Sequence, residues 1–112
     1  MGERGLRTAY EILLRSASRG EVLRYFYPYD DYHEIASPFY SRLYQFQKAK
    51  GLERRGINSM RFVSFPLPGI IDIIKNNLLI ITWANVTGIL VTSKEIAEHF
   101  KNYSDSIWNM AG

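Results

Sequence analysis

Two short apolar runs, separated by three polar residues, most constrain what this chain can fold into. The runs are Ile70–Ile74 and Leu78–Trp83, with Lys75, Asn76 and Asn77 between them. Each run has the length of a strand, and the break is short enough for a tight hairpin in which the asparagines take the positive φ angles that the turn demands. Because both runs are almost wholly apolar, we expect them to lie in a buried sheet.

The stretch that contains this hairpin is not expected to cross a membrane, because charged and amide residues interrupt it, beginning with Asp72 and Lys75. The whole chain has 112 residues and a formal net charge of +3, which fits one domain. It opens on an amphipathic segment instead of a secretory signal. The absence of cysteine excludes a disulfide scaffold, a thiolate metal site and a cysteine nucleophile. We therefore expect a cytoplasmic location.

The periodicity of the remaining sequence predicts three helices and three more strands. Apolar residues at helical spacing, with Ser-Pro, Gly and capping-box signals at the ends, predict helices over 6–18, from Ser37 to Gly56, and from Thr92 to the end. Strand-forming runs cover 21–27, 60–65 and 87–91. The order α-β-α-β-β-β-β-α indicates an α/β domain, a mixed sheet of about five strands flanked by three helices.

Motifs for the commonest chemistries are missing from the sequence. His33 and His99 lack metal-ligand spacing, and no glycine-rich phosphate loop or nucleophile elbow is present, so we expect no metal site, no cofactor and no catalytic residue. His99 is expected at the helix surface. His33 shares a loop with Asp30, Asp31 and Glu34, which is either a coupled acid-base site or a solvated turn.

The hairpin and the residues after it resemble a known superfamily. The stretch 71–87 resembles the second half of a phospholipase-D-like motif, and Ser93–Glu98 resembles the start of the superfamily's long helix. The superfamily's catalytic signature is His-x-Lys-x4-Asp, in which histidine is the nucleophile. Its three positions fall here at Gly69, Ile71 and Asn76. The resemblance implies a retained fold without the phosphodiester-cleaving reaction.

The chain resembles more closely the phospholipase-D-like C-terminal effector domain of TrmB-type archaeal transcription regulators. The resemblance covers the opening Gly5–Leu13, the first strand at 21–27, the Arg54–Ile57 exit and the stretches Ile80–Trp83 and Ser93–Glu98. It implies that residues 1–112 are a single effector or sensor domain. The family's helix-turn-helix, through which DNA would be bound, lies outside this chain, so the chain is either an excised effector domain or a stand-alone relative.

The expected function is therefore non-catalytic, namely effector sensing or oligomerisation in transcription regulation. One alternative is a phosphodiester-cleaving enzyme of the phospholipase-D-like type. Another is a direct nucleic-acid-binding module, which the mildly basic charge favours. The basic residues that suggest it lie on one segment: Arg42, Lys48, Lys50, Arg54 and Arg55.

The C-terminal helix predicts a homodimer. It carries more apolar residues than one small sheet face requires, and phospholipase-D-like sites are usually built from two copies of the domain. The alternative is that this stripe is simply core. Its members are Ile96, Phe100, Tyr103, Ile107, Trp108 and Met110.

Two strand ends predict a ligand site. Small molecules bind beyond the carboxyl ends of strands in open α/β sheets, and unusual groups follow the first strand and the hairpin. We expect six of them to converge on one pocket for a small polar metabolite: Tyr27, Tyr29, Asp31, His33, Trp83 and Asn85. The alternative is that Trp83 is core and the tyrosines cover the sheet edge.

Overall fold

The structure, a computed structural model, describes residues 2–15, 17–28 and 33–111, with only the backbone of His33. These residues form three helices and five strands. In chain order they are α1 (Glu3–Arg15), β1 (Val22–Phe26), α2 (His33–Ala49), β2 (Glu53–Ile57), β3 (Ile70–Ile74), β4 (Asn77–Thr82), β5 (Thr87–Thr92) and α3 (Lys94–Met110).

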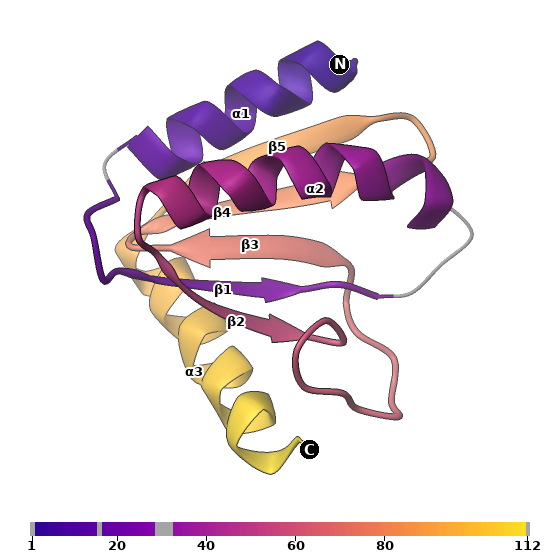
Figure 1. The fold of residues 1–112 in the computed structure, drawn as a ribbon. Helices are drawn as coiled ribbons and strands as arrows, with labels where there is room; N and C mark the ends of the chain where they lie inside the picture. Colours follow the sequence, from indigo (N-terminus) through magenta and orange to yellow (C-terminus); the bar gives the residue numbers. More distant parts are fainter. Residues whose placement is uncertain (1, 16, 29–32, 112) are drawn as a thin grey trace.

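All five strands belong to one mixed sheet with the order β2-β1-β3-β4-β5 (Figure 1). β1 and β2 run parallel and are connected through α2, whereas the β1–β3, β3–β4 and β4–β5 pairs are antiparallel. One row across the sheet brings distant residues together, because Tyr25 on β1 is in register with Gly56 on β2 and with Asp72 on β3.

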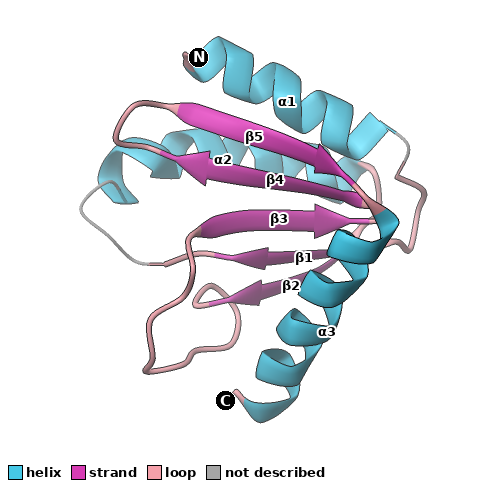
Figure 2. Ribbon diagram, turned by 180° about the vertical axis from the view of Figure 1, so that it is seen from behind, coloured by secondary structure: helices cyan, strands magenta, loops and turns pink. Residues whose placement is uncertain are grey.

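The helices cover the two faces of the sheet unequally. α1 and α2 lie side by side on one face, here called the two-helix face, while α3 crosses the opposite, one-helix face (Figures 1 and 2). Every residue of the central strand β3 is buried, because successive side chains enter the two cores in turn. The expected α/β architecture, a mixed five-stranded sheet with three helices, is confirmed.

The second helix and second strand divide the chain differently from the prediction. The helix expected from Ser37 to Gly56 begins at His33 and ends at Ala49, with Pro38 inside it. The predicted continuation to Gly56 is wrong. Gly51 has φ +71° and turns the chain, after which Glu53–Ile57 pairs with β1 as β2. Its charged residues resembled the outer face of a helix, but they lie on an edge strand, where charge is tolerated.

The strand predicted over 60–65 is also wrong. Asn58 takes φ +64° and turns the chain back, so that Arg61 makes only an isolated bridge to Ile57. The segment between β2 and β3 is a loop, whose Val63 and Leu67 pack against the core of the one-helix face. Arg61 fastens this loop to α3, since its guanidinium stacks 4.1 Å from the Trp108 ring and donates to the Trp108 carbonyl at 2.7 Å.

In the second half of the chain, the hairpin turn and the helix start lie where the sequence predicts, but other residues take the key roles in them. The β3–β4 hairpin forms, although Lys75 and not an asparagine takes the positive φ, at +53°. α3 starts where the capping box predicts, but Ser93 is the N-cap and accepts from the Ile96 amide. Thr92 instead donates to the Asn77 side chain and closes the end of the β4–β5 pair.

The apolar stripe expected on the C-terminal helix is divided between core and surface. Ile107 is buried, and Phe100 and Trp108 pack partly against the one-helix core. Ile96, Tyr103 and Met110 are exposed. Within the described part of the chain, no helix is both long and apolar enough to cross a membrane.

Gly56 is required by the close approach of Tyr25. A methyl group at Gly56 would overlap the Tyr25 ring. We predict that Gly56→Ala lowers the free energy of unfolding by about 1–3 kcal/mol, because the ring must leave its position over β2. Urea denaturation measures the effect, with Gly2→Ala as the control, since a Cβ at Gly2 meets nothing within 4 Å. Equal midpoints for wild type and Gly56→Ala would contradict this packing.

Candidate functional site

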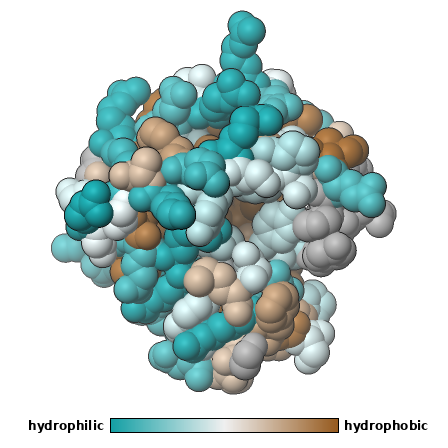
Figure 3. Space-filling view, viewed as in Figure 1, coloured by the Kyte–Doolittle hydropathy of each residue, from teal (hydrophilic) through white to brown (hydrophobic). Residues whose placement is uncertain are grey.

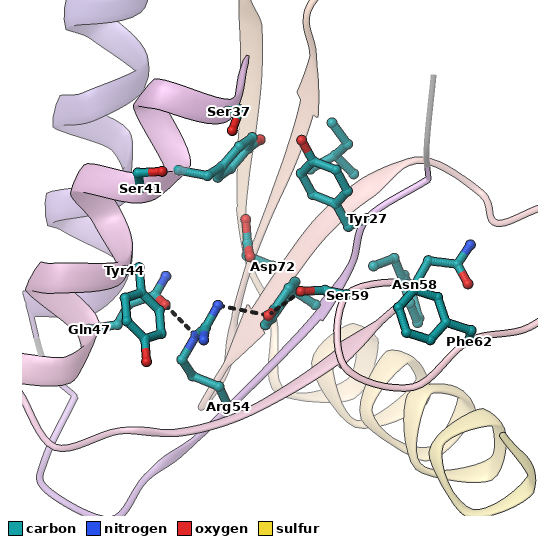
Figure 4. A pocket seen from close by; sticks show the side chains of 14 residues that line it. Tyr27, Ser37, Ser41, Tyr44, Gln47, Arg54, Asn58, Ser59, Phe62 and Asp72 are labelled. Carbon is teal, nitrogen blue, oxygen red and sulfur yellow. Dashed lines mark hydrogen bonds between the residues drawn. The ribbon is translucent and has the colours of Figure 1, made fainter. Parts of the chain in front are cut away.

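A cavity of about 440 Å³ lies between α2 and the two-helix face of the sheet, near the ends of β1 and β2. Pale, mildly polar side chains border a hollow near the middle of this surface (Figure 3). The lining combines aromatic rings with polar groups from α2, β1, β2, β3 and the loop after β2 (Figure 4). Its members are Tyr25, Phe26, Tyr27, Ser37, Tyr40, Ser41, Tyr44, Gln47, Arg54, Asn58, Ser59, Phe62, Ile70 and Asp72.

Asp72 lies on the sheet side of the cavity. It is the only acidic residue of β3, its exposed fraction is 4%, and Tyr10 of α1 donates a hydrogen bond to its Oδ2 atom. Burial raises the pKa of Asp72 to about 7, against smaller lowering effects from the Tyr10 hydrogen bond and the charge of Arg54. The carboxyl group is therefore poised between its neutral and ionised forms near neutral pH.

The aromatic core continues from Asp72 through Tyr10 and Tyr40. The Tyr10 and Tyr40 rings pack edge-on, at 6.4 Å between centroids. The Trp83 indole donates to the Tyr40 hydroxyl at 3.1 Å. Burial, followed by the charge of Asp72, raises the pKa of Tyr10 and of Tyr40, so both hydroxyls stay protonated.

Arg54 brings a cation to the opposite wall. Its Nε donates to Gln47 of α2 at 2.9 Å and its Nη2 donates to the Tyr25 hydroxyl at 2.8 Å, as the dashed lines in Figure 4 show. The guanidinium also lies 4.2 Å from the Tyr44 ring centroid and 5.3 Å from that of Tyr25. Two strands and one helix thus hold this side chain at the cavity.

The loop after β2 completes the wall through Ser59, whose hydroxyl is 3.0 Å from that of Tyr25. Tyr25 therefore connects Arg54 on one side with the loop on the other. Phe62 of the same loop lines the cavity and is exposed to solvent. The ring of Tyr25 occupies the space that Gly56 leaves free.

The six residues predicted for the ligand site divide into three groups. Tyr27 lines the cavity and packs edge-on against Tyr40, at 5.4 Å between ring centroids. Trp83 also packs edge-on against Tyr40, at 5.9 Å between ring centroids, but it is 7% exposed and belongs to the core. Asn85 is exposed in the β4–β5 turn, where it accepts a hydrogen bond from Thr82.

The rest of that site falls outside what the structure describes. Tyr29 and Asp31 lie outside the described residues, as does the Asp30 neighbour of the predicted acid-base loop, and His33 is described only as the first residue of α2. Convergence of all six residues on one pocket stays a prediction. The structure brings Tyr27 and Trp83 to the same tyrosine.

The sequence analysis missed three residues that dominate the cavity, namely Asp72, Tyr40 and Arg54, and also Tyr10, which binds Asp72 from α1. One signal was present, because Asp72 is a single charge inside the apolar run Ile70–Ile74. A buried carboxylate needs partners, so such a residue marks a functional or structural polar site. Its partner Tyr10 carried no comparable signal, since it continued the apolar stripe of α1.

The arrangement presents groups that can bind a small molecule. The cavity offers a carboxyl acceptor, a guanidinium donor, several hydroxyls and aromatic faces. Among the described residues, no group of three or more His, Asp or Glu side chains could hold a metal ion. Comparisons of the chain with protein-family models, with curated proteins and with solved structures find no match.

The raised pKa of Asp72 predicts how stability depends on pH. The unfolded carboxyl has a pKa of 3.8 and the folded one of about 7, so the folded state binds the proton more tightly. The contribution of Asp72 to the free energy of unfolding is fully present below pH 4 and is lost as the pH rises through 7. We expect Asp72→Asn to gain stability relative to wild type over this window, by roughly 4 kcal/mol at pH 8.

Urea titrations of wild type and Asp72→Asn at several pH values measure this difference. Tyr10→Phe is the second variant, because the Tyr10 hydrogen bond lowers the pKa of Asp72. Without this hydrogen bond the pKa of Asp72 rises, so the loss of stability should end at a higher pH than in wild type. If the free energies of unfolding of wild type and Asp72→Asn differ by the same amount from pH 4 to pH 8, the raised pKa of Asp72 is wrong.

Proposed function

We propose that this chain is a non-catalytic, effector-sensing domain that binds a small metabolite in the cavity between α2 and the sheet. The observation that carries the proposal is the cavity itself, which combines about 440 Å³ of space with aromatic walls and a few convergent polar groups. Those are the properties of small-molecule sites in proteins. The resemblance to phospholipase-D-like effector domains of TrmB-type archaeal regulators supports a role in transcription regulation.

The positions that would carry phosphodiester cleavage favour binding over catalysis. Gly69, Ile71 and Asn76 offer no nucleophile and no cation, and Ile71 is 3% exposed in the core of the one-helix face. The ionisable residues of the cavity are a carboxyl, a guanidinium and tyrosines, and they face the opposite side of the sheet. We therefore propose that the domain turns over no phosphodiester.

The basic residues also give little support to direct nucleic-acid binding. Arg42 pairs with Glu3, Lys50 donates to the Leu14 carbonyl and Arg55 pairs with Glu53. Arg54 is engaged in the cavity wall. A nucleic-acid surface needs cations gathered on one face and directed outward, whereas these residues are spread over α2, the turn after it and β2.

Ligand screening tests the proposed function. A library of sugars, amino acids, nucleosides and organic acids is assayed by thermal denaturation of the wild-type protein. A compound at a hundred times its dissociation constant adds about 2.7 kcal/mol of stability, which shifts the melting temperature by more than about 10 °C in a domain of this size. Ser41→Trp places an indole in the cavity mouth and should abolish the shift.

The matched control is Ser106→Trp, an exposed serine on α3 that does not line the cavity. The ligand should stabilise this variant as it does wild type. The proposal fails when no compound raises the melting temperature of the wild type, or when a compound stabilises Ser41→Trp equally well.

We also propose that the domain forms a homodimer through the one-helix face. Ile96 and Tyr103 of α3 are exposed on this side, as is Ile89, which is paired with Ile80 of the same face. Light scattering should give twice the 13.0 kDa chain mass at high micromolar concentration. Ile96→Lys should yield the monomer, whereas Ile12→Lys on α1, with the same 43% exposure, should leave the dimer intact. A wild-type mass of one chain contradicts the dimer.

A further inference from the structure

The first clue to the class of ligand is an unused acceptor in the cavity. Asp72 is more than nine-tenths buried, and Tyr10 occupies its Oδ2 atom. No donor among the described side chains reaches Oδ1, although the residue lines the cavity. A buried carboxyl oxygen gains most from a charged N–H donor, because charge-assisted hydrogen bonds are the strong ones. The Asp72 end of the cavity therefore suits an ammonium group.

The second clue is a cation with donors left over. Arg54 uses Nε for Gln47 and one hydrogen of Nη2 for Tyr25, and the structure gives Nη1 no acceptor within the described part of the chain. The contacts that hold the guanidinium fix its plane, which prepares it for a carboxylate. The Arg54 end of the cavity suits a carboxylate group.

The separation of these two ends limits the size of the charged part of the ligand. Asp72 is in register with Gly56 across β1, and Arg54 lies two residues from Gly56 along β2, so two strand spacings and two residues put their backbones about 12 Å apart. Both side chains point into the cavity in Figure 4. Because the long Arg54 side chain covers part of this distance, a group that carries an ammonium and a carboxylate on one carbon, with a hydrogen bond of about 2.8 Å at each end, fits between the two charged ends.

The remaining walls are aromatic. Tyr27, Tyr40 and Phe62 line the cavity beyond the charged pair, and their rings supply apolar faces for stacking. The volume of about 440 Å³ exceeds what the charged part of such a ligand needs. The surplus space next to these rings suits an aromatic side chain.

We propose that the cavity binds a zwitterion of the aromatic α-amino acid class, with its ammonium group on Asp72, its carboxylate on Arg54 and its ring against Tyr27, Tyr40 and Phe62. This inference rests on the proposed function, because it assigns the ligand of the same cavity. It makes Asp72 and Arg54 the residues that determine specificity, each reading one charge of the ligand.

Calorimetric titration with three related probes tests the assignment. L-phenylalanine carries both charges, L-phenylalanine amide lacks the carboxylate, and N-acetyl-L-phenylalanine lacks the ammonium. L-phenylalanine should bind at least tenfold more tightly than either derivative. Asp72→Asn should weaken L-phenylalanine and its amide at least tenfold and leave the N-acetyl compound unchanged. Arg54→Lys, which keeps the charge but loses the planar fork, should weaken L-phenylalanine and the N-acetyl compound and spare the amide.

Two outcomes separate this inference from the proposed function. When the three probes bind equally well or not at all, while another library compound stabilises wild type and Ser106→Trp but not Ser41→Trp, the zwitterion is wrong and the sensing function stands. A neutral sugar or nucleoside would be such a compound. When no compound binds the cavity, both proposals are overturned. Urea denaturation of each variant confirms that it is folded, and an unfolded Arg54→Lys is replaced by Arg54→Gln.

Discussion

The hydrogen bond between Tyr10 and Asp72 ties α1 to the central strand of the sheet. Tyr10 comes from α1 and Asp72 from β3, and Tyr40 of α2 packs edge-on against the Tyr10 ring. A carboxyl group at this depth is stable only while its partners remain, because an unpaired buried charge costs several kcal/mol. The packing of α1 and α2 is therefore tied to one polar contact as well as to apolar area.

Different interactions hold the helices on the two faces of the sheet. On the one-helix face, the core is apolar apart from the buried Ser104 of α3, and the ion pair between Arg24 and Asp105 lies at its border. On the two-helix face, hydroxyls, an indole and a carboxyl are distributed among the aromatic rings. Buried polar networks specify one arrangement more strictly than apolar contacts do. The two-helix face is accordingly where a cavity can keep a defined shape.

The sequence predicted the framework of the fold because that framework depends on local patterns. The stripe of α1 and the runs of β3 and β4 repeat apolar residues at one period, and the structure confirms them. β2 was missed because Glu53, Arg54 and Arg55 resemble the outside of a helix until the turn at Gly51 is known. The cavity was missed because Tyr10 and Asp72 are 62 residues apart, and no local pattern encodes such a pairing.

The loop between β2 and β3 has contacts on both sides of the sheet, and it therefore connects the cavity with α3. At one end, Ser59 and Phe62 border the cavity; at the other, Arg61 grips the last turn of α3 through Trp108. A ligand that displaced Phe62 would also move Arg61, the preceding residue, and so disturb the contacts of Arg61 with Trp108. Occupancy on one face of the sheet would then be transmitted to the end of the helix on the other face, without any change in the strands between them.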